Sequence, residues 1–138
     1  MSTDLHWLLT RNWTSYQVRQ GNGTPTFSRE PDNLLNISSP KYSGALGHAI
    51  GVRETKDKGF TYHHRKADAL VHHVAKGRET KTLDKQHGLH RSAKHATSVA
   101  HDGQRPELSR ATAARVHALM AARRAKKSKS KSAKKSEA

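Results

Sequence analysis

The feature that most limits what this chain can fold into is its small stock of large apolar side chains. Leu, Ile, Val and Phe together supply 21 of 138 residues, and the formal net charge is +15 at pH 7. That share lies below the roughly 20% at which a high net charge begins to favour disorder. We therefore expect one small hydrophobic core, with much of the remaining chain becoming ordered against a partner whose contacts offset the lost conformational entropy.

The positive charge is distributed unevenly along the chain. Residues 1–62 carry seven basic and five acidic residues, whereas residues 63–138 carry 19 basic and six acidic residues. This pattern predicts a folded first half and a second half that contacts a polyanion. We divide the chain into a small α+β domain (1–66), a basic helical region (67–122) and a lysine-rich tail (123–138).

The first half contains patterns for one helix and four strands. Residues 2–13 predict a short helix, capped by Ser2 or Thr3. Segments 14–18 and 26–28 flank Gly21 to Gly23 and predict a hairpin, and segments 49–55 and 59–66 predict a second one. We expect one small antiparallel sheet with the helix on one face. The helix residues expected to pack there are Leu5, Trp7, Leu8 and Leu9.

The second half reads as helical. Residues 66–82 are ambiguous between helix and irregular chain, whereas residues 90–103 predict a helix that stops at Gly103. Pro106 suits the start of a final helix. The apolar stripe predicted on that helix comprises Leu108, Thr112, Val116, Leu119 and Met120. The tail has eight basic residues in sixteen and nothing to bury, so we expect it to be disordered when isolated in water.

The sequence offers no motif for catalysis. Glu30 and Asp32 flank Pro31 and precede Asn33, which is typical of a turn in which Asp and Asn oxygens accept backbone N–H groups. We expect Glu30 to pair with a nearby arginine, Arg29 or Arg11. The chain has no cysteine, no phosphate-binding glycine motif and no nucleophile elbow. We therefore predict that the protein is not an enzyme and uses neither a cofactor nor a small-molecule substrate.

The eleven histidines raise the alternative of a metal site. Metal sites need three or four converging ligands, but adjacent histidines on a strand point to opposite sides. We therefore expect the histidine doublets at 63–64 and 72–73 to lie on the surface beside Lys and Arg. The pKa values of these histidines would rise against phosphate. We therefore predict no metal site. The alternative hypothesis is a histidine-rich metal enzyme, which would lose its activity when a chelator removes the metal.

The start of the chain indicates no targeting or membrane segment. Its longest early apolar run is the three residues after His6, and the first ten residues contain Asp4 and no arginine. A signal peptide, a membrane span and a transit peptide are therefore not expected. We predict a cytoplasmic or nuclear protein without a membrane partner.

Nucleic acid is the polyanion that this charge pattern favours. Arginine guanidinium groups can fork to phosphates, tail lysines act as point charges, and Trp13 or Tyr42 are candidates for stacking on unpaired bases. The predicted phosphate contacts are Arg11, Arg65, Lys66, Arg91, Lys94, Arg105, Arg110, Arg115, Arg123, Arg124, Lys126 and Lys127. We also expect that removal of residues 123–138 weakens attachment to RNA and leaves the fold intact.

Four segments occur in an order that resembles the eukaryote-type large-subunit ribosomal protein number twenty-eight. They are DLHWLLTRN, FSREPDNL, SSPKYSG and RPELSRATAARVHAL. The matching residues are Trp7, Arg11, Asn12, Phe27, Ser28, Glu30, Pro31, Asn33, Leu34, Tyr42, Gly44, Arg105, Pro106 and Leu108. The resemblance spans most of residues 3–124, whereas residues 63–101 depart from the family pattern in their many histidines.

The resemblance implies a structural constituent of the cytosolic large ribosomal subunit. Its implied partners are large-subunit ribosomal RNA and neighbouring ribosomal proteins, and its implied route to the cytoplasm passes through the nucleolus during assembly. Two rivals remain open. An assembly factor would bind only precursor particles, and a chromatin-associated DNA-binding protein would carry a similar tail, usually with more prolines among its lysines.

Overall fold

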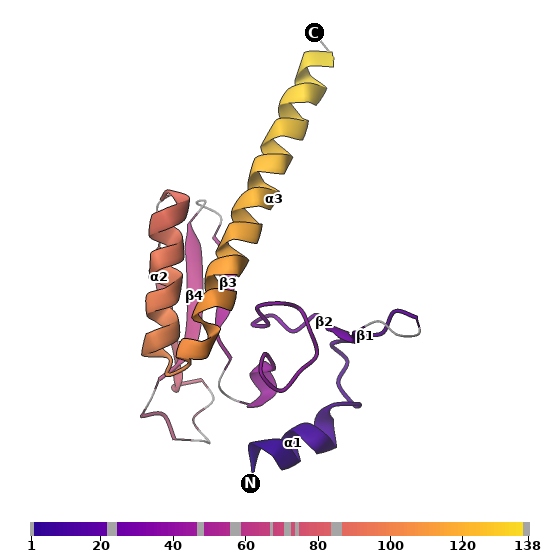
Figure 1. Cartoon of the computed structure of the whole chain (residues 1–138), viewed down its shortest axis with the longest axis vertical. Helices are drawn as coiled ribbons and strands as arrows, with labels where there is room; N and C mark the ends of the chain where they lie inside the picture. The colour runs from indigo at the N-terminus through magenta and orange to yellow at the C-terminus, as the bar shows by residue number, and fades with distance from the viewer. Residues whose placement is uncertain are drawn as a thin grey trace.

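The computed structural model describes residues 2–21, 25–46, 49–55, 59–66, 68–70, 73, 75–83 and 87–136, with the backbone alone for 129–136. Figure 1 shows the order of the elements along the chain. These elements are α1 (Thr3–Thr10), β1 (Gln17–Val18), β2 (Phe27–Ser28), η1 (Gly44–Leu46), β3 (Gly51–Glu54), β4 (Phe60–Arg65), β5 (Arg78–Leu83), α2 (Leu89–Asp102), η2 (Pro106–Leu108) and α3 (Ser109–Ser136). The α+β class is confirmed.

A three-stranded antiparallel sheet in the order β3-β4-β5 forms the centre of the fold. The predicted hairpin of β3 and β4 is confirmed, with Val52 opposite Tyr62, while residues 56–58 at its turn lie outside the described residues. Side chains along β4 alternate between the two faces, so that Phe60, Tyr62 and His64 are buried. The same period-2 alternation is what the sequence pattern predicted.

Strand β5 falls in the segment that the sequence left undecided between helix and irregular chain. It pairs with β4 along its whole length, from Arg78 opposite Arg65 to Leu83 opposite Phe60. The strand RETKTL holds a single large apolar residue, so no apolar alternation marks it. Pairing with an already formed hairpin makes this segment a strand, which is a tertiary effect that local propensity does not report.

Helices α2 and α3 form an antiparallel pair on one face of this sheet (Figure 1). The predicted helix over 90–103 is confirmed as α2, which ends at Gly103. Pro106 opens the 3₁₀ turn η2, from which α3 continues. The predicted stripe is also confirmed, because Leu108, Thr112 and Val116 are at most 1% exposed.

The core is completed where α2 meets β4. The Tyr62 hydroxyl donates a hydrogen bond of 3.1 Å to the Ser92 carbonyl, and burial raises the pKa of Tyr62 to about 12. The Thr112 hydroxyl of α3 donates to the Ala96 carbonyl of α2 at 3.2 Å. Apolar packing and satisfied polar groups thus join both helices to the sheet. The core contains residues from both the predicted α+β domain (1–66) and the predicted basic helical region (67–122).

The predicted placement of the N-terminal elements is wrong in two respects. β1 and β2 form a separate two-stranded ladder instead of joining one sheet. The helix α1 exists, but it lies against η1 and buries none of its residues, and Trp7 is only half-buried. The reason is that α2 and α3 already occupy the apolar sheet face. The leucines of α1 remain 48–61% exposed; they are Leu5, Leu8 and Leu9.

The cap predicted for α1 is also wrong in its chemistry. Ser2 occupies the N-cap position with an extended backbone, but its side chain makes no capping hydrogen bond. The predicted first hairpin is confirmed as a shorter ladder in which Val18 pairs with Phe27. Gly21 adopts a φ of +60° before its turn, and residues 22–24 lie outside the described residues.

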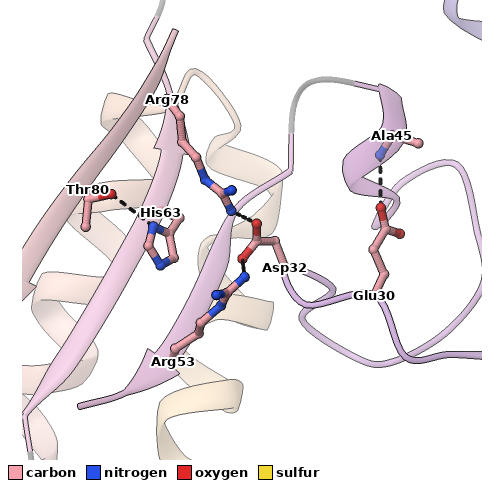
Figure 2. A network of polar contacts seen from close by, with 7 residues as sticks. All are labelled: Glu30, Asp32, Ala45, Arg53, His63, Arg78 and Thr80. Carbon is pink, nitrogen blue, oxygen red and sulfur yellow. Dashed lines mark hydrogen bonds and ion pairs between the residues drawn. The ribbon is translucent and has the colours of Figure 1, made fainter. Parts of the chain in front are cut away.

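Asp32 links the N-terminal segment to the sheet (Figure 2). Its Oδ1 accepts a bond of 2.8 Å from Arg53 Nη2 of β3, and its Oδ2 pairs with the Arg78 guanidinium of β5. Asp32 is 13% exposed. Gly51 is required beneath it, because a Cβ there would lie 2.4 Å from Asp32 Oδ1. Asp32 is thus a clamp across two strands, rather than the backbone-capping residue predicted from sequence.

The rest of the turn is close to its prediction. Asn33 is buried and its Oδ1 accepts the backbone N–H groups of Leu35 and Ile37. Glu30 does not pair with Arg29 or Arg11, because its Oε1 instead accepts the Ala45 N–H at 3.0 Å (Figure 2). The acidic pair is therefore structural, with each carboxylate joined to a segment distant in sequence.

We expect Asp32→Asn to lower the free energy of unfolding by about 2 kcal/mol, because two arginine side chains lose their shared carboxylate. Chemical denaturation followed by circular dichroism measures the change. Asp68→Asn removes the same charge from an exposed position and serves as the control. Equal denaturation midpoints for the two variants would show that the clamp contributes nothing.

Candidate nucleic-acid interface

Helix α3 is a long cationic element. Its 28 residues include ten Lys and Arg and no Asp or Glu. At 1.5 Å per residue the helix is about 42 Å long, comparable with a small domain. Lysines at 127, 131 and 135 repeat at a spacing of four, at which like charges repel one another on a helix. A polyanion alongside would relieve that repulsion, so this element suits a chain of phosphates.

One face of α3 is fixed to the sheet as far as Arg123. Its Nε donates to Glu54 Oε1 of β3 at 2.9 Å, and its guanidinium lies 5.1 Å from the centre of the Phe60 ring. The side chain is 19% exposed. A cation over an aromatic face and a carboxylate partner both stabilise this position. Arg123 therefore anchors the helix in addition to the contact with RNA predicted for it.

Exposed basic residues flank the buried stripe of α3. Arg110, His117 and Arg124 are exposed and lie seven residues apart, so they share one side of the helix. A groove of about 390 Å³ opens on this side between the start of α2 and the middle of α3. Its lining comprises Leu89, His117, Ala118, Met120, Ala121 and Arg124. The groove has an apolar floor and a basic edge.

Most predicted contact residues are exposed in the structure, although they do not form a single cluster. Those on the helical side are Arg91, Lys94, Arg110, Arg124, Lys126 and Lys127. Lys66 follows β4, and Arg11 follows α1, a helix that lies apart from α2 and α3 (Figure 1). Arg115 is half-buried. Six of the twelve predicted residues are therefore exposed on the two helices.

Two further predicted residues are engaged within the protein. Arg65 donates to the carbonyls of Ala69 and Leu70, the latter at 2.8 Å. Arg105 pairs with Glu107 and also donates to the Lys41 carbonyl at 3.2 Å. The contacts of both residues with RNA stay predictions.

Sequence reasoning missed two exposed arginines in the first half, Arg19 and Arg29. The low net charge of residues 1–62 as a whole conceals them. A shorter window would have found them, because residues 11–29 contain three arginines and no acidic residue. Tyr42, proposed for base stacking, is instead half-buried against the core.

The histidines are less exposed than the sequence suggested. His64 is 3% exposed beneath α2, which corrects its assignment to the surface, and its Nε2 lies 3.8 Å from Glu79 Oε2. His63 faces the other side of β4, where its Nδ1 bonds Thr80 Oγ1 at 3.0 Å (Figure 2). The ring of His95 packs at a tilt of 44° against that of Tyr62, with 4.8 Å between the ring centres. The doublet therefore divides between two sheet faces, as predicted.

Burial lowers the pKa of His63, His64 and His95 below the ordinary value of 6.5. For His64, the nearby Glu79 carboxylate opposes this effect and Lys81 adds to it. All three rings are therefore neutral at pH 7, and they add no charge to the basic surface. In the described ranges, no three side chains of His, Asp or Glu converge as metal ligands. None of the helices described has the length and apolarity that a membrane crossing needs.

The chain matches one protein family. The model of the Ribosomal L28e protein family covers residues 5–122, which is most of the chain. The matched range includes α2 and most of α3, and it stops before the lysine-rich end of that helix. The comparison with curated proteins gave no match.

We expect the protein to lose stability as the pH falls from about 7.5 to about 5.5. Histidine in the unfolded chain binds a proton near pH 6.5, whereas the buried rings bind one only at lower pH. The unfolded state therefore takes up more protons over this range. Melting temperatures across the range measure the effect.

The His64→Gln variant should show a shallower pH dependence of the melting temperature than the native protein. His90→Gln replaces an exposed histidine of α2 and is the matched control. A native-like slope in His64→Gln would show that protonation of this buried ring does not limit stability.

Proposed function

Because the chain belongs to the Ribosomal L28e protein family, whose members are structural constituents of the large ribosomal subunit, we propose that it binds large-subunit ribosomal RNA through α2, α3 and the tail. The observation that carries this proposal is the run of ten cations without an acidic residue along one 28-residue helix. Proteins of this family are typically structural, and we propose no catalytic role here. We also propose residence in cytosolic ribosomes after assembly in the nucleolus.

The charges of the folded part support binding to a polyanion. Six acidic side chains in the described part have partners within the protein; they are Glu30, Asp32, Glu54, Glu79, Asp102 and Glu107. Most of these partners are Lys, Arg or His on the sheet and its connections. Helix α3 itself contains no acidic residue. Its exposed Arg110 and Arg124 are candidates for phosphate contacts, and phosphates release counterions when they are neutralised.

The shape of the interface favours phosphate contacts over the reading of bases. Arg91, Arg110 and Arg124 are long exposed side chains on two packed helices, and the lysines of the tail follow on the same rod. Such cations position RNA backbones and carry little sequence information. Neighbouring ribosomal proteins are further expected partners, since the leucines of α1 leave an apolar surface exposed.

We expect a chain that ends after Ala125 to keep its fold and to leave large subunits at lower salt than the full chain. This truncation keeps Arg123, which the deletion of residues 123–138 expected from sequence would remove, because Arg123 contacts both Glu54 and Phe60. The measurement is sedimentation of the tagged protein with ribosomal particles before and after a high-salt wash. A full-length variant with the six tail lysines changed to glutamine separates charge from length.

The same gradients test the proposed function itself. Retention of the full chain in mature subunits and polysomes supports it. Recovery only with precursor particles would indicate an assembly factor, and absence from every ribosomal fraction would return the question to DNA. A truncated chain that melts well below the full one would contradict the expected intact fold.

We expect the double variant Arg110→Ala/Arg124→Ala to bind ribosomal RNA with a weaker salt dependence. Loss of two phosphate contacts should reduce the slope of log affinity against log salt by about 1.5. Filter binding at several salt concentrations measures the slope. The matched control, Lys41→Ala/Lys76→Ala, removes two exposed cations outside the helices. An equal change in both double variants would refute a specific role of the helical side.

A further inference from the structure

The segment from Arg11 to Arg29 combines exposed aromatic side chains with unopposed positive charge. Trp13 is 88% exposed and Tyr16 is 49% exposed. Arg11, Arg19 and Arg29 are all exposed, and no acidic residue occurs between positions 11 and 29. A solvent-facing tryptophan is costly to leave uncovered, because its large apolar surface contacts water.

The backbone holds these side chains in a defined arrangement. The backbone N–H of Trp13 donates to the Thr10 carbonyl at 2.9 Å, and this bond fixes the turn that follows α1. The Arg29 N–H donates to the Tyr16 carbonyl at 2.8 Å, so these two residues extend the ladder of β1 and β2. Residues 11–21 and 25–29, which we call the ribbon, carry these aromatic and basic side chains, and backbone hydrogen bonds hold them at Trp13 and at Tyr16.

This ribbon lies away from the basic helices. Figure 1 shows β1 and β2 on the opposite side of the molecule from α2. The side chains of this ribbon and the groove between α2 and α3 therefore cannot contact the same site on one RNA helix. Nearby Glu30 bonds the Ala45 N–H through its Oε1, and it forms no ion pair with Arg11, Arg19 or Arg29 in the described part of the chain.

We propose that this ribbon is a second RNA-binding site, which takes unpaired nucleotides by stacking bases on Trp13 and Tyr16. Exposed aromatic faces accept any base, while arginines beside them contact the backbone phosphates. Duplex RNA offers no free base faces, so this site discriminates between the two forms. This inference rests on the proposed function, which supplies RNA as the ligand. It adds where on the protein the RNA binds and that the RNA bound there is unpaired. The exposed leucines of α1 are a less suitable site for unpaired RNA, because fewer cations lie near them in the sequence.

The test uses the full chain with Trp7→Phe, in which Trp13 is the sole tryptophan. Short oligouridine should quench its fluorescence, and a duplex RNA of equal length should not. In the native background, Trp13→Ala should weaken oligouridine binding about 5-fold or more, whereas Trp13→Phe should retain most of the affinity. Leu8→Ala removes another exposed apolar side chain and is the matched control.

Equal affinity of Trp13→Ala and the native chain for oligouridine would overturn the inference, as would equal quenching by duplex RNA. A Trp13→Ala defect in subunit association without any loss of oligouridine binding would also overturn it and would indicate a protein contact. None of these outcomes bears on α3. Failure of the proposed function would instead appear as loss of both ribosome association and binding to ribosomal RNA by the native chain.

Discussion

Burial of one face of a three-stranded sheet under two helices is the interaction on which all other parts of the fold rely. Phe60 and Tyr62 from β4, Val99 from α2, Leu108 from η2 and Val116 from α3 are all at most 1% exposed. A chain with so few large apolar residues can build one such core and no more. Everything outside it must be held by hydrogen bonds, by ion pairs or by another molecule.

The described acidic residues illustrate this constraint. Asp32 joins the N-terminal segment to β3 and β5, Glu54 holds α3 at Arg123, and Lys81 of β5 pairs with Asp102 of α2 at 2.5 Å. Exposed pairs of this kind contribute little stability individually, but Asp32 and Arg123 are mostly covered. The acidic groups thus organise the fold, and the net positive charge is left on surfaces that face outward.

Two such surfaces result, and they differ in chemistry. The side of α3 and α2 carries cations above a groove with an apolar floor, which suits packed phosphates. The ribbon carries exposed Trp13 and Tyr16 beside exposed arginines, which suits the unpaired bases proposed for it. A protein with both surfaces on opposite sides can join separate RNA segments within one particle. Such bridging is consistent with a structural constituent of the large ribosomal subunit.

The elements with a local signal can be read from the residues alone. Period-2 alternation specified β3 and β4, and the stripe from Leu108 to Met120 specified the last helix, whereas the polyanionic partner that the excess of Lys and Arg favours stays a prediction. Contacts between distant segments set the remaining features. RETKTL became a strand only because β4 offered a partner, α1 was excluded from the sheet because α2 and α3 covered it, and Asp32 became a clamp because folding brought Arg53 and Arg78 to it. Propensity and periodicity act over a few residues, whereas these outcomes depend on which distant side chains compete for one sheet face and one carboxylate.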